Sequence, residues 1–385
     1  MTRRRNLYVG ATFLALIVAL GMGLMVLERT AVAQAQGGTQ APIFQVDPMW
    51  PKPLPNHWIV GSTIGVAVDA QDHVWIIHRP ATILAGEKGA VANPPTSECC
   101  VPAPQVLEFD QAGNLVSSWG GTGAGYEWPQ SEHGIYVDHK DNVWVGANGK
   151  GDAQILKFTW QGKFLLQIGH QGKNGGSNDT QNLGQPANIE TDAASNEVYV
   201  ADGYGNRRVI VYDADTGAYK RHWGAYGNKP DDTDPGKYDP NGPPPKQFRT
   251  PVHCSTISKD GLVYVCDRAN NRIQVFQKNG KFVKEAFIAK KTLGSGAAWD
   301  ADFSKDAQQR FLYDTDGSNQ KVWMLLRDPL QLVGSFGQGG HFAGQFYGAH
   351  SLAVDSKGNL YVTETYEGKR VQRFVFKGLG PSSSQ

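Results

Sequence analysis

The sequence has no excess of charge of either sign. Its 385 residues carry 37 Lys and Arg against 36 Asp and Glu. Proteins that bind nucleic acid or anionic surfaces usually present a strong positive field, and this chain has no basis for one. We therefore expect no nucleic-acid partner.

Beyond its N-terminal segment, the sequence has no run that is apolar enough to span a membrane. In that segment three arginines at residues 3–5 precede the apolar residues 7–27, and small residues follow at 31–35. This is the order of an export signal, and its start partly resembles a twin-arginine signal. We expect residues 1–36 to be either a cleaved signal peptide or a retained membrane anchor. In both cases the rest of the chain is exported, to the periplasm or the extracellular space.

Cysteine is scarce, and the four residues present fit an oxidising compartment. Cys254 and Cys266 lie equally far from Asp260, which centres a turn between two apolar runs. They would therefore face each other on paired strands, and we expect a disulfide between them. Cys99 and Cys100 are neighbours in a proline-rich loop, where a vicinal disulfide and two free thiols are both compatible with the sequence.

Several familiar catalytic patterns are also missing. The sequence shows no phosphate-binding loop, no dinucleotide-binding fingerprint, and no Ser-His-Asp or Cys-His arrangement. Glycine and tryptophan, in contrast, are abundant, with 46 and 10 residues. Many short strands closed by glycine turns, with aromatic side chains packed between sheets, would give this composition.

One pattern of strand, polar turn and strand recurs along the chain. Its clearest copy is PVHCSTISKDGLVYVCDRANNRIQVF, residues 251–276. Related segments cover residues 62–79, 131–149, 186–212, 294–325 and 348–374. All-strand repeats of this length predict an all-β, six-bladed β-propeller with four-stranded blades. A β-sandwich is the alternative, but it does not explain a repeat that spans the whole chain.

We expect a single propeller domain over residues 42–377. The long loops 81–104 and 226–247 are rich in Pro, Gly or Asp and are interpreted as insertions on one face. Residues 43–46 are a candidate strand to close the ring beside the last blade. Residues 378–385 are expected to form a disordered tail.

Three histidines share one position in the repeat. His133, His253 and His350 each stand 11 residues before the aromatic residue of the second strand, in blades two, four and six. The same count gives Ile64 in blade one and Asn188 in blade three. Alternate blades of a six-bladed ring would bring the three imidazoles together at the axis. Three convergent neutral imidazoles predict a metal site with an open position, with zinc as the first choice and iron, copper or nickel as alternatives.

A second shared position lies four or five residues after the same aromatic. It holds Arg79 in blade one, Tyr204 in blade three and Arg268 in blade four. These side chains should lie at the same mouth as the histidines, because hairpin strands reverse direction. Two guanidiniums could hold a carboxylate, and a tyrosine beside them could act as a general base. His78 is a further candidate ligand or supporting group.

A third shared position, eight residues after the aromatic, holds Arg207, Arg272 and Lys369. A basic residue that recurs in this way indicates a structural role. The remaining histidines fall in turns or loops, where we expect them to be solvated: His57, His73, His139, His170, His222 and His341.

These motifs together resemble a known family. The chain is similar to the catalytic core of peptidyl-α-hydroxyglycine α-amidating lyase, a six-bladed propeller of NHL-type repeats. The resemblance extends over about residues 62–376. It is carried by Gly65-Val66-Ala67-Val68-Asp69, His78-Arg79, His133-Gly134, Asp202-Gly203-Tyr204, His253, Asp267-Arg268 and His350.

The resemblance implies roles for the matching residues. His133, His253 and His350 would bind a catalytic zinc, and Tyr204 would be the base. Arg79 and Arg268 would flank the site. The reaction would cleave the N–Cα bond of a C-terminal α-hydroxyglycine and give an amide and glyoxylate.

The sequence also departs from the family. The resemblance implies a structural calcium held by backbone carbonyls, matching Val66 and Ile135, and by an aspartate, but Ser351 stands at the aspartate position. The family's disulfides do not align with Cys254 and Cys266. The copper monooxygenase domain that makes the hydroxyglycine substrate has no counterpart in this sequence, so the substrate could be another hydroxylated amide.

We therefore expect an exported, zinc-dependent carbon–nitrogen lyase that acts on a small molecule or peptide bearing a carboxylate. Two alternatives stay open. One is a metal-dependent lactonase or esterase on the same fold. The other is an NHL-type propeller without catalytic activity that binds a protein or a glycan. A propeller fold alone does not separate them.

Overall fold

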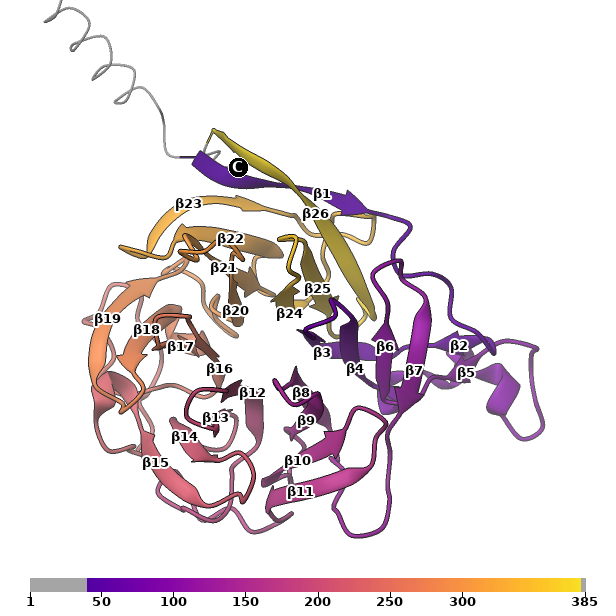
Figure 1. Cartoon of the computed structure of the whole chain (residues 1–385), viewed down its shortest axis with the longest axis horizontal. Coiled ribbons are helices and arrows are strands. Elements are labelled where there is room, and N and C mark those ends of the chain that lie inside the picture. The colour runs from indigo at the N-terminus through magenta and orange to yellow at the C-terminus, as the bar shows by residue number, and fades with distance from the viewer. Residues whose placement is uncertain (1–39, 382–385) are drawn as a thin grey trace, which may run out of the picture.

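The computed structural model describes residues 40–381. These residues form six four-stranded antiparallel sheets around one axis, with β3, β8, β12, β16, β20 and β24 innermost (Figure 1). The predicted six-bladed propeller with four-stranded blades is therefore confirmed. The export-signal prediction for residues 1–36 lies outside the described residues, as do residues 382–385.

Blades one to three follow one another along the chain. In blade one the strands are β3 (Ser62–Val68), β4 (Val74–Arg79), β6 (Val106–Phe109) and β7 (Leu115–Trp119). In blade two they are β8 (Glu132–Val137), β9 (Asn142–Ala147), β10 (Gln154–Thr159) and β11 (Phe164–Gly169). In blade three they are β12 (Pro186–Asp192), β13 (Glu197–Asp202), β14 (Arg208–Asp213) and β15 (Tyr219–Trp223).

Blades four to six complete the ring. In blade four the strands are β16 (Val252–Ile257), β17 (Leu262–Asp267), β18 (Arg272–Gln277) and β19 (Phe282–Phe287). In blade five they are β20 (Asp300–Phe303), β21 (Phe311–Asp316), β22 (Lys321–Leu326) and β23 (Gln331–Phe336). In blade six they are β24 (Ala349–Val354), β25 (Leu360–Glu364), β26 (Arg370–Pro381) and β1 (Gln40–Asp47).

The two ends of the described chain close the ring together. Strand β1 pairs antiparallel with β26 and forms the outer edge of blade six (Figure 1). The segment expected to close the ring, residues 43–46, lies in β1. Residues 378–381, which we expected to begin a disordered tail, instead extend β26 and pair with residues 40–42. A blade built from both ends of the chain leaves no open seam at the start of the propeller.

The loops lie mostly at one mouth of the ring. The insertion between β4 and β6 contains the 3₁₀ helices η1 (Pro80–Thr82), η2 (Ala85–Glu87) and η3 (Gly89–Val91). Its strand β5 (Val101–Pro102) pairs in parallel with β2 (Trp58–Ile59), and this segment projects beyond blade one (Figure 1). Two further turns of 3₁₀ helix are η4 (Ala225–Gly227) and η5 (Arg268–Asn270). Within residues 40–381 we find no helix of the length and apolarity that a membrane span requires.

The cysteines form two pairs. Cys254 and Cys266 face each other on β16 and β17, in the register that the sequence predicts, and are joined by a disulfide. Cys99 and Cys100 are joined to each other in the projecting loop.

The core lies between the blades. Each second strand places one large aromatic side chain there, and all six are at most 2% exposed: Trp75, Trp144, Tyr199, Tyr264, Tyr313 and Tyr361. In three blades the polar end of this ring reaches a carboxylate in the turn that precedes its strand. Trp75 and Trp144 donate to Asp69 and Asp138, and the Tyr361 hydroxyl donates to Asp355. The aromatic residue thereby buries its ring and still satisfies its donor.

Buried ion pairs close the turns at the mouth that carries the long loops. Arg208 binds Asp202 and Arg272 binds Asp267, each at 2.8 Å between side chains that are fully buried. Arg370 binds the buried Glu364 at 2.6 Å, although its own side chain is 27% exposed. The recurrent arginine of blades three and six is therefore Arg208 or Arg370, one residue after the predicted Arg207 and Lys369.

The register changes because the turns of blades three and six are one residue longer than the turn of blade four. The displaced side chains bind elsewhere. Arg207 donates to backbone carbonyls of residues 231 and 233, and Lys369 pairs with Glu87 in the projecting loop.

Polar side chains of the odd blades bind the inner strands of the even blades. Glu190 of β12 accepts a hydrogen bond from the Ile257 amide of β16, and Asp300 of β20 accepts one from the Leu352 amide of β24. They line an axial cavity of about 150 Å³ together with Asp302. Burial raises the pKa of Glu190 to about 8 and that of Asp300 to about 7.

This cavity makes stability depend on pH. Because the folded protein raises the pKa of Glu190 to about 8, the folded state is favoured while this carboxyl is protonated. That stability is lost as pH rises from the unfolded pKa, about 4.3, towards 8. Glu190→Gln keeps an acceptor oxygen for Ile257 and removes the titration. We expect the variant to gain about 1–3 kcal/mol over the wild type between pH 5 and pH 8.

The measurement is urea denaturation of both proteins at the two pH values. Glu98→Gln, at an exposed position, is the matched control and should show no such gain. Equal pH dependence in wild type and Glu190→Gln would contradict the prediction.

Candidate metal centre

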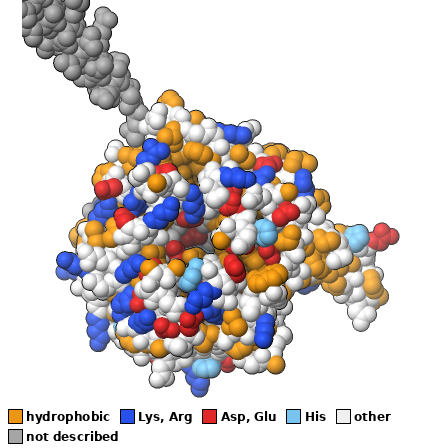
Figure 2. Space-filling model, viewed as in Figure 1, with side chains coloured by type: hydrophobic (Ala, Val, Ile, Leu, Met, Phe, Trp, Pro, Cys, Tyr) orange, Lys and Arg blue, Asp and Glu red, His pale blue; other side chains and the backbone are white. Residues whose placement is uncertain are grey.

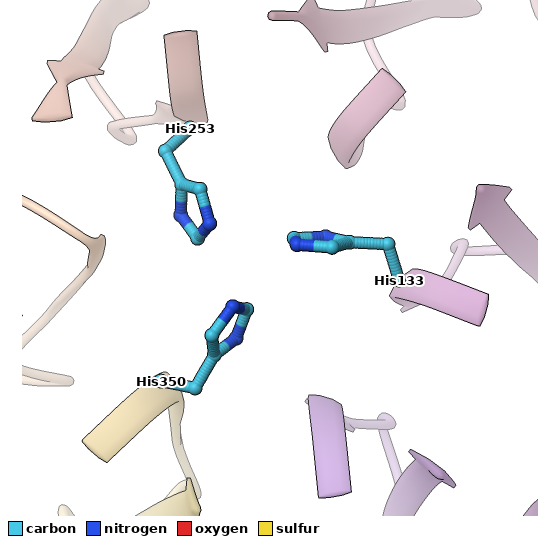
Figure 3. A group of neighbouring side chains, drawn as sticks. All are labelled: His133, His253 and His350. Atoms are coloured by element: carbon cyan, nitrogen blue, oxygen red, sulfur yellow. The ribbon is translucent and has the colours of Figure 1, made fainter. Parts of the chain in front are cut away.

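The structure brings the three predicted histidines together at the axis (Figure 3). His133 lies on β8, His253 on β16 and His350 on β24. Their ring centroids are 4.8–5.1 Å apart, and one ligand nitrogen of each lies within 4.8 Å of the others. All three side chains are at most 2% exposed. Alternate blades thus supply one imidazole each to a single buried point.

A β-bulge places each histidine. The register between the first and second strands shifts at this position in all three blades, between Glu132 and Ile135, Val252 and Cys254, and Ala349 and Leu352. A bulge adds a residue to one strand and changes the direction of its side chain. The histidines therefore leave the alternation of their strands and turn towards the axis.

The odd blades have other residues at the same position. Blade one has Ile64 there, as the sequence indicates. Blade three has Ala187 and not the predicted Asn188, because the turn between β12 and β13 is one residue longer than in blade four. Blade five has Trp299 there, immediately before β20. Trp299 is more than 11 residues before Tyr313, the aromatic residue of its second strand, so a fixed spacing of 11 misses it.

Backbone carbonyls of these odd-blade residues fix the imidazoles. His133 Nδ1 donates to the carbonyl of Ala187 at 2.6 Å, and His253 Nδ1 donates to that of Trp299. His350 reaches its odd-blade carbonyl through a hydroxyl: its Nδ1 lies 3.3 Å from Ser351 Oγ, which donates its proton to the carbonyl of Ile64 and therefore accepts from Nδ1. A carbonyl accepts only from a protonated nitrogen, so Nδ1 carries the proton and the Nε2 lone pair is free to bind. Each blade with a histidine thus depends on the next blade for its tautomer.

The three imidazoles are neutral at physiological pH. Burial lowers the pKa of all three well below the usual value, and the nearby arginines lower it further. Neutral imidazole is the form that binds a metal ion. Burial and the nearby arginines therefore keep the histidines in the neutral form, whose lone pairs can bind a metal ion.

Tyr204 reaches the centre from the turn after β13. Its hydroxyl oxygen lies 3.0 Å from Nε2 of both His133 and His253, and Arg268 Nη1 donates to it at 3.1 Å. The hydroxyl has one proton, so it can donate to only one of the two imidazoles. The Nε2 lone pairs of His133 and His253 therefore compete for a single proton, and a cation bound by the three imidazoles would satisfy them. This donor set fits zinc with an open fourth position.

The two predicted arginines flank the same mouth. Arg268 donates from Nε to the Ser295 carbonyl at 3.0 Å and lies over the ring of Trp299 at 4.5 Å. Arg79 donates from Nε to the Glu132 carbonyl and from Nη2 to Asn148 Oδ1, at 2.8 and 2.7 Å. Both guanidiniums are thus held by more than one contact.

Two residues of this mouth, Trp299 and Asn148, were not identified from the sequence as parts of the site, and neither had a signal there. Trp299 supports Arg268, and Asn148 orients Arg79. Tyr366 is the counterpart of Tyr204 in blade six, and its side chain is exposed. The repeat places it at the second shared position, because it stands five residues after Tyr361, as Tyr204 does after Tyr199.

Two further sequence hypotheses concern residues outside the triad. His78 does not reach the centre: it is buried between the amide of Gly61, which donates to its Nδ1, and the carbonyl of Pro104. For calcium, the residues matching the family's carbonyl ligands, Val66 and Ile135, both line the axial cavity. Ser351 donates to the Ile64 carbonyl instead of supplying a carboxylate. The calcium expectation stays a prediction.

The geometry predicts that His253→Ala abolishes zinc binding at the axis, because two imidazoles and a tyrosine hydroxyl make a weaker donor set. We expect the variant to contain about one equivalent of tightly held zinc less than the wild type. The measurement is metal content by mass spectrometry after zinc loading and dialysis. His139→Ala, in an exposed turn, is the control and should keep the wild-type content. Equal zinc in wild type and His253→Ala would contradict the prediction.

Comparison with known proteins agrees with the repeat and gives distant relatives. The family model of the NHL repeat matches residues 256–276 and 346–374. Human NHL repeat-containing protein 3 is 26% identical over 356 residues, which cover 88% of this chain and 85% of that protein. Peptidyl-α-hydroxyglycine α-amidating lyase 1 of Drosophila melanogaster is 26% identical over 356 residues, or 87% of this chain and 60% of that protein.

Among solved structures, a streptogramin B lyase has a TM-score of 0.48 and 12% identity and covers 88% of this chain and 98% of that chain. The chain is thus a propeller with NHL repeats that is distantly similar both to amidating lyases and to NHL repeat-containing protein 3.

Proposed function

We propose that the protein is an exported, zinc-dependent lyase that cleaves the N–Cα bond of a C-terminal α-hydroxyglycine, or of a similar hydroxylated amide. The observation that carries the proposal is the contact of the Tyr204 hydroxyl with two ligand histidines and with Arg268. A metal that serves only structure needs ligands, but it does not need a hydroxyl and a guanidinium in the open position. The distant similarity to an amidating lyase supports the same reading.

Substrate binding follows from the charges at the mouth. Arg79 and Arg268 come from opposite blades of the ring and both face the centre, where each lowers the pKa of His133. A carboxylate between them would be bound by charge-assisted hydrogen bonds. The hydroxyl on the adjacent carbon would then point to the Nε2 atoms. Trp299 and Asn148 hold the two guanidiniums, so little ordering is left to be done when the substrate binds.

Tyr204 is positioned to move the proton. Tyr204 would act as tyrosinate, after its own proton has passed to solvent: its oxygen would take the proton of the substrate hydroxyl, the C–O bond would become a carbonyl, and the N–Cα bond would break. The bonding electrons stay with nitrogen, which takes up a proton to give the amide; the other product is glyoxylate. Arg268 donates to the tyrosine oxygen and stabilises its negative charge when the proton has left. A bound zinc ion would supply Lewis-acid polarisation of the hydroxyl oxygen.

The purified, zinc-loaded protein should release glyoxylate from an N-acyl-α-hydroxyglycine, and a chelator should abolish the release. The measurement is glyoxylate by coupled enzymatic assay, with an N-acylglycine that lacks the hydroxyl as the control substrate. No release from protein shown to contain zinc would contradict the proposal. Hydrolysis of lactones or esters by the same sample would then favour the hydrolase alternative, and inactivity on all three would favour a binding propeller.

Tyr204→Phe should keep its zinc but lose turnover, because the ring remains and only the proton-transferring oxygen is removed. We expect kcat to fall by about 10²–10⁴ with little change in KM. Tyr219→Phe, whose hydroxyl contacts His222 on an outer strand, is the matched control. Full activity in Tyr204→Phe would show that Tyr204 is a packing residue.

A further inference from the structure

A second group of metal-ligating side chains lies on blade one. Asp69 and His73 belong to the turn between β3 and β4, and Glu108 lies on the neighbouring β6. One ligand atom from each lies within 4.8 Å of the others, which in the described part of the chain is true only of this group and of the axial histidines. The axial histidines lie where the inner strands begin, whereas this group lies where β3 ends. The two groups are therefore at different mouths of the ring.

Two other blades, two and six, also have polar residues at the three matching positions. Blade two has Asp138 and Asn142 in its turn and Lys157 on its third strand, with Lys157 Nζ 3.7 Å from Asp138. Blade six has Asp355, Asn359 and Arg373 at the same three positions. Both blades thus have a cation on the third strand; in blade two it pairs with the turn carboxylate, and in blade six Arg373 pairs with Asp47.

Blade one replaces two of these three residues. His73 stands where blades two and six have asparagine, and Glu108 stands where they have a cation. The exchange puts a second carboxylate beside Asp69 and removes the positive charge. Glu108 is only 5% exposed, and burial raises its pKa, as does Asp69. The position therefore has two facing carboxylates, and His73 lies against both of them.

The geometry of the three groups suits one ion. His73 Nδ1 lies 2.7 Å from Glu108 Oε1 and 3.9 Å from Asp69 Oδ2. Ligand atoms that are each about 2.1 Å from a metal lie about 3–4 Å from one another in tetrahedral or octahedral arrangements. Small side-chain rotations would therefore bring all three into coordination.

The carboxylate of Asp69 is fixed in advance. Its Oδ1 accepts the amides of Gln71 and His73, and its Oδ2 accepts the indole of Trp75. These bonds hold the oxygen that faces His73 and leave it one lone pair. A ligand held by such bonds needs little ordering to bind a metal.

The group also has access to solvent. It lines a cavity of about 260 Å³ between blades one and two, together with Asp141 and Trp160. His73 is one-third exposed at its edge. Water molecules could therefore complete the coordination of an ion held by three protein ligands.

We propose that Asp69, His73 and Glu108 form a second metal site, for a divalent cation that accepts one imidazole and two carboxylates, with Zn²⁺ as the representative. One imidazole with two carboxylates fits Zn²⁺ or Mn²⁺, and the absence of a thiolate from the set disfavours Cu⁺. The proposal is independent of the lyase activity, because it uses none of the axial residues.

The test is a zinc titration of the purified, chelator-treated protein by calorimetry. A weak chelator in the buffer keeps loose surface binding out of the count. We expect two equivalents in the wild type and one in His73→Asn or Glu108→Lys. Both substitutions restore residues that blade two has at these positions, so the blade should fold. His253→Ala should also bind one equivalent, and the double variant His73→Asn/His253→Ala none.

The same zinc content in wild type and His73→Asn would overturn the proposal. If Glu108→Lys does not fold, His73→Asn decides alone, and circular dichroism shows which variants are folded. Glyoxylate release should be unchanged in His73→Asn. The experiment can thus contradict the proposed second site without contradicting the axial site and the lyase activity, or the reverse.

Discussion

The link from Nδ1 of each axial histidine to a carbonyl of the next blade is the interaction on which the rest of the centre depends; it is direct for His133 and His253 and passes through the Ser351 hydroxyl for His350. It fixes the tautomer, it sets the rotation of the ring, and it connects each even blade to the odd blade that follows. Because ligands and carbonyls alternate around the ring, the pattern closes only with an even number of blades. Ring closure by β1 and β26 is therefore also a condition for the site.

The centre could be predicted from the sequence to the extent that turn lengths are equal. His133, His253 and His350 share a spacing of 11 residues because the first turns of blades two, four and six have the same length. The longer turn of blade three displaced the prediction from Ala187 to Asn188, and the long turn of blade five hid Trp299. A fixed residue spacing along the sequence gives the wrong residue whenever a turn contains an added residue.

Contacts between distant loops could not be predicted from the sequence, for a different reason. Nothing in the order of residues shows that Arg268 stacks on Trp299 or that Asn148 accepts from Arg79, because these contacts depend on how neighbouring blades pack. The acids of the axial cavity are similar. Glu190 and Asp300 read as ordinary strand residues, yet each binds an amide of the next blade's inner strand. The repeat predicts the blades, but the side chains that join the blades differ at each junction.

This variation explains how one repeat can serve structure at one blade and chemistry at another. The turn aspartate accepts the indole of the buried tryptophan in blades one and two alike, so its structural role is the same in both. The neighbouring side chains then decide what the aspartate can bind. Lys157 neutralises Asp138 in blade two, whereas Glu108 adds a charge beside Asp69 in blade one. Two different side chains on the same backbone are thus enough to convert a turn whose charges are balanced into a group of ligands that requires a cation.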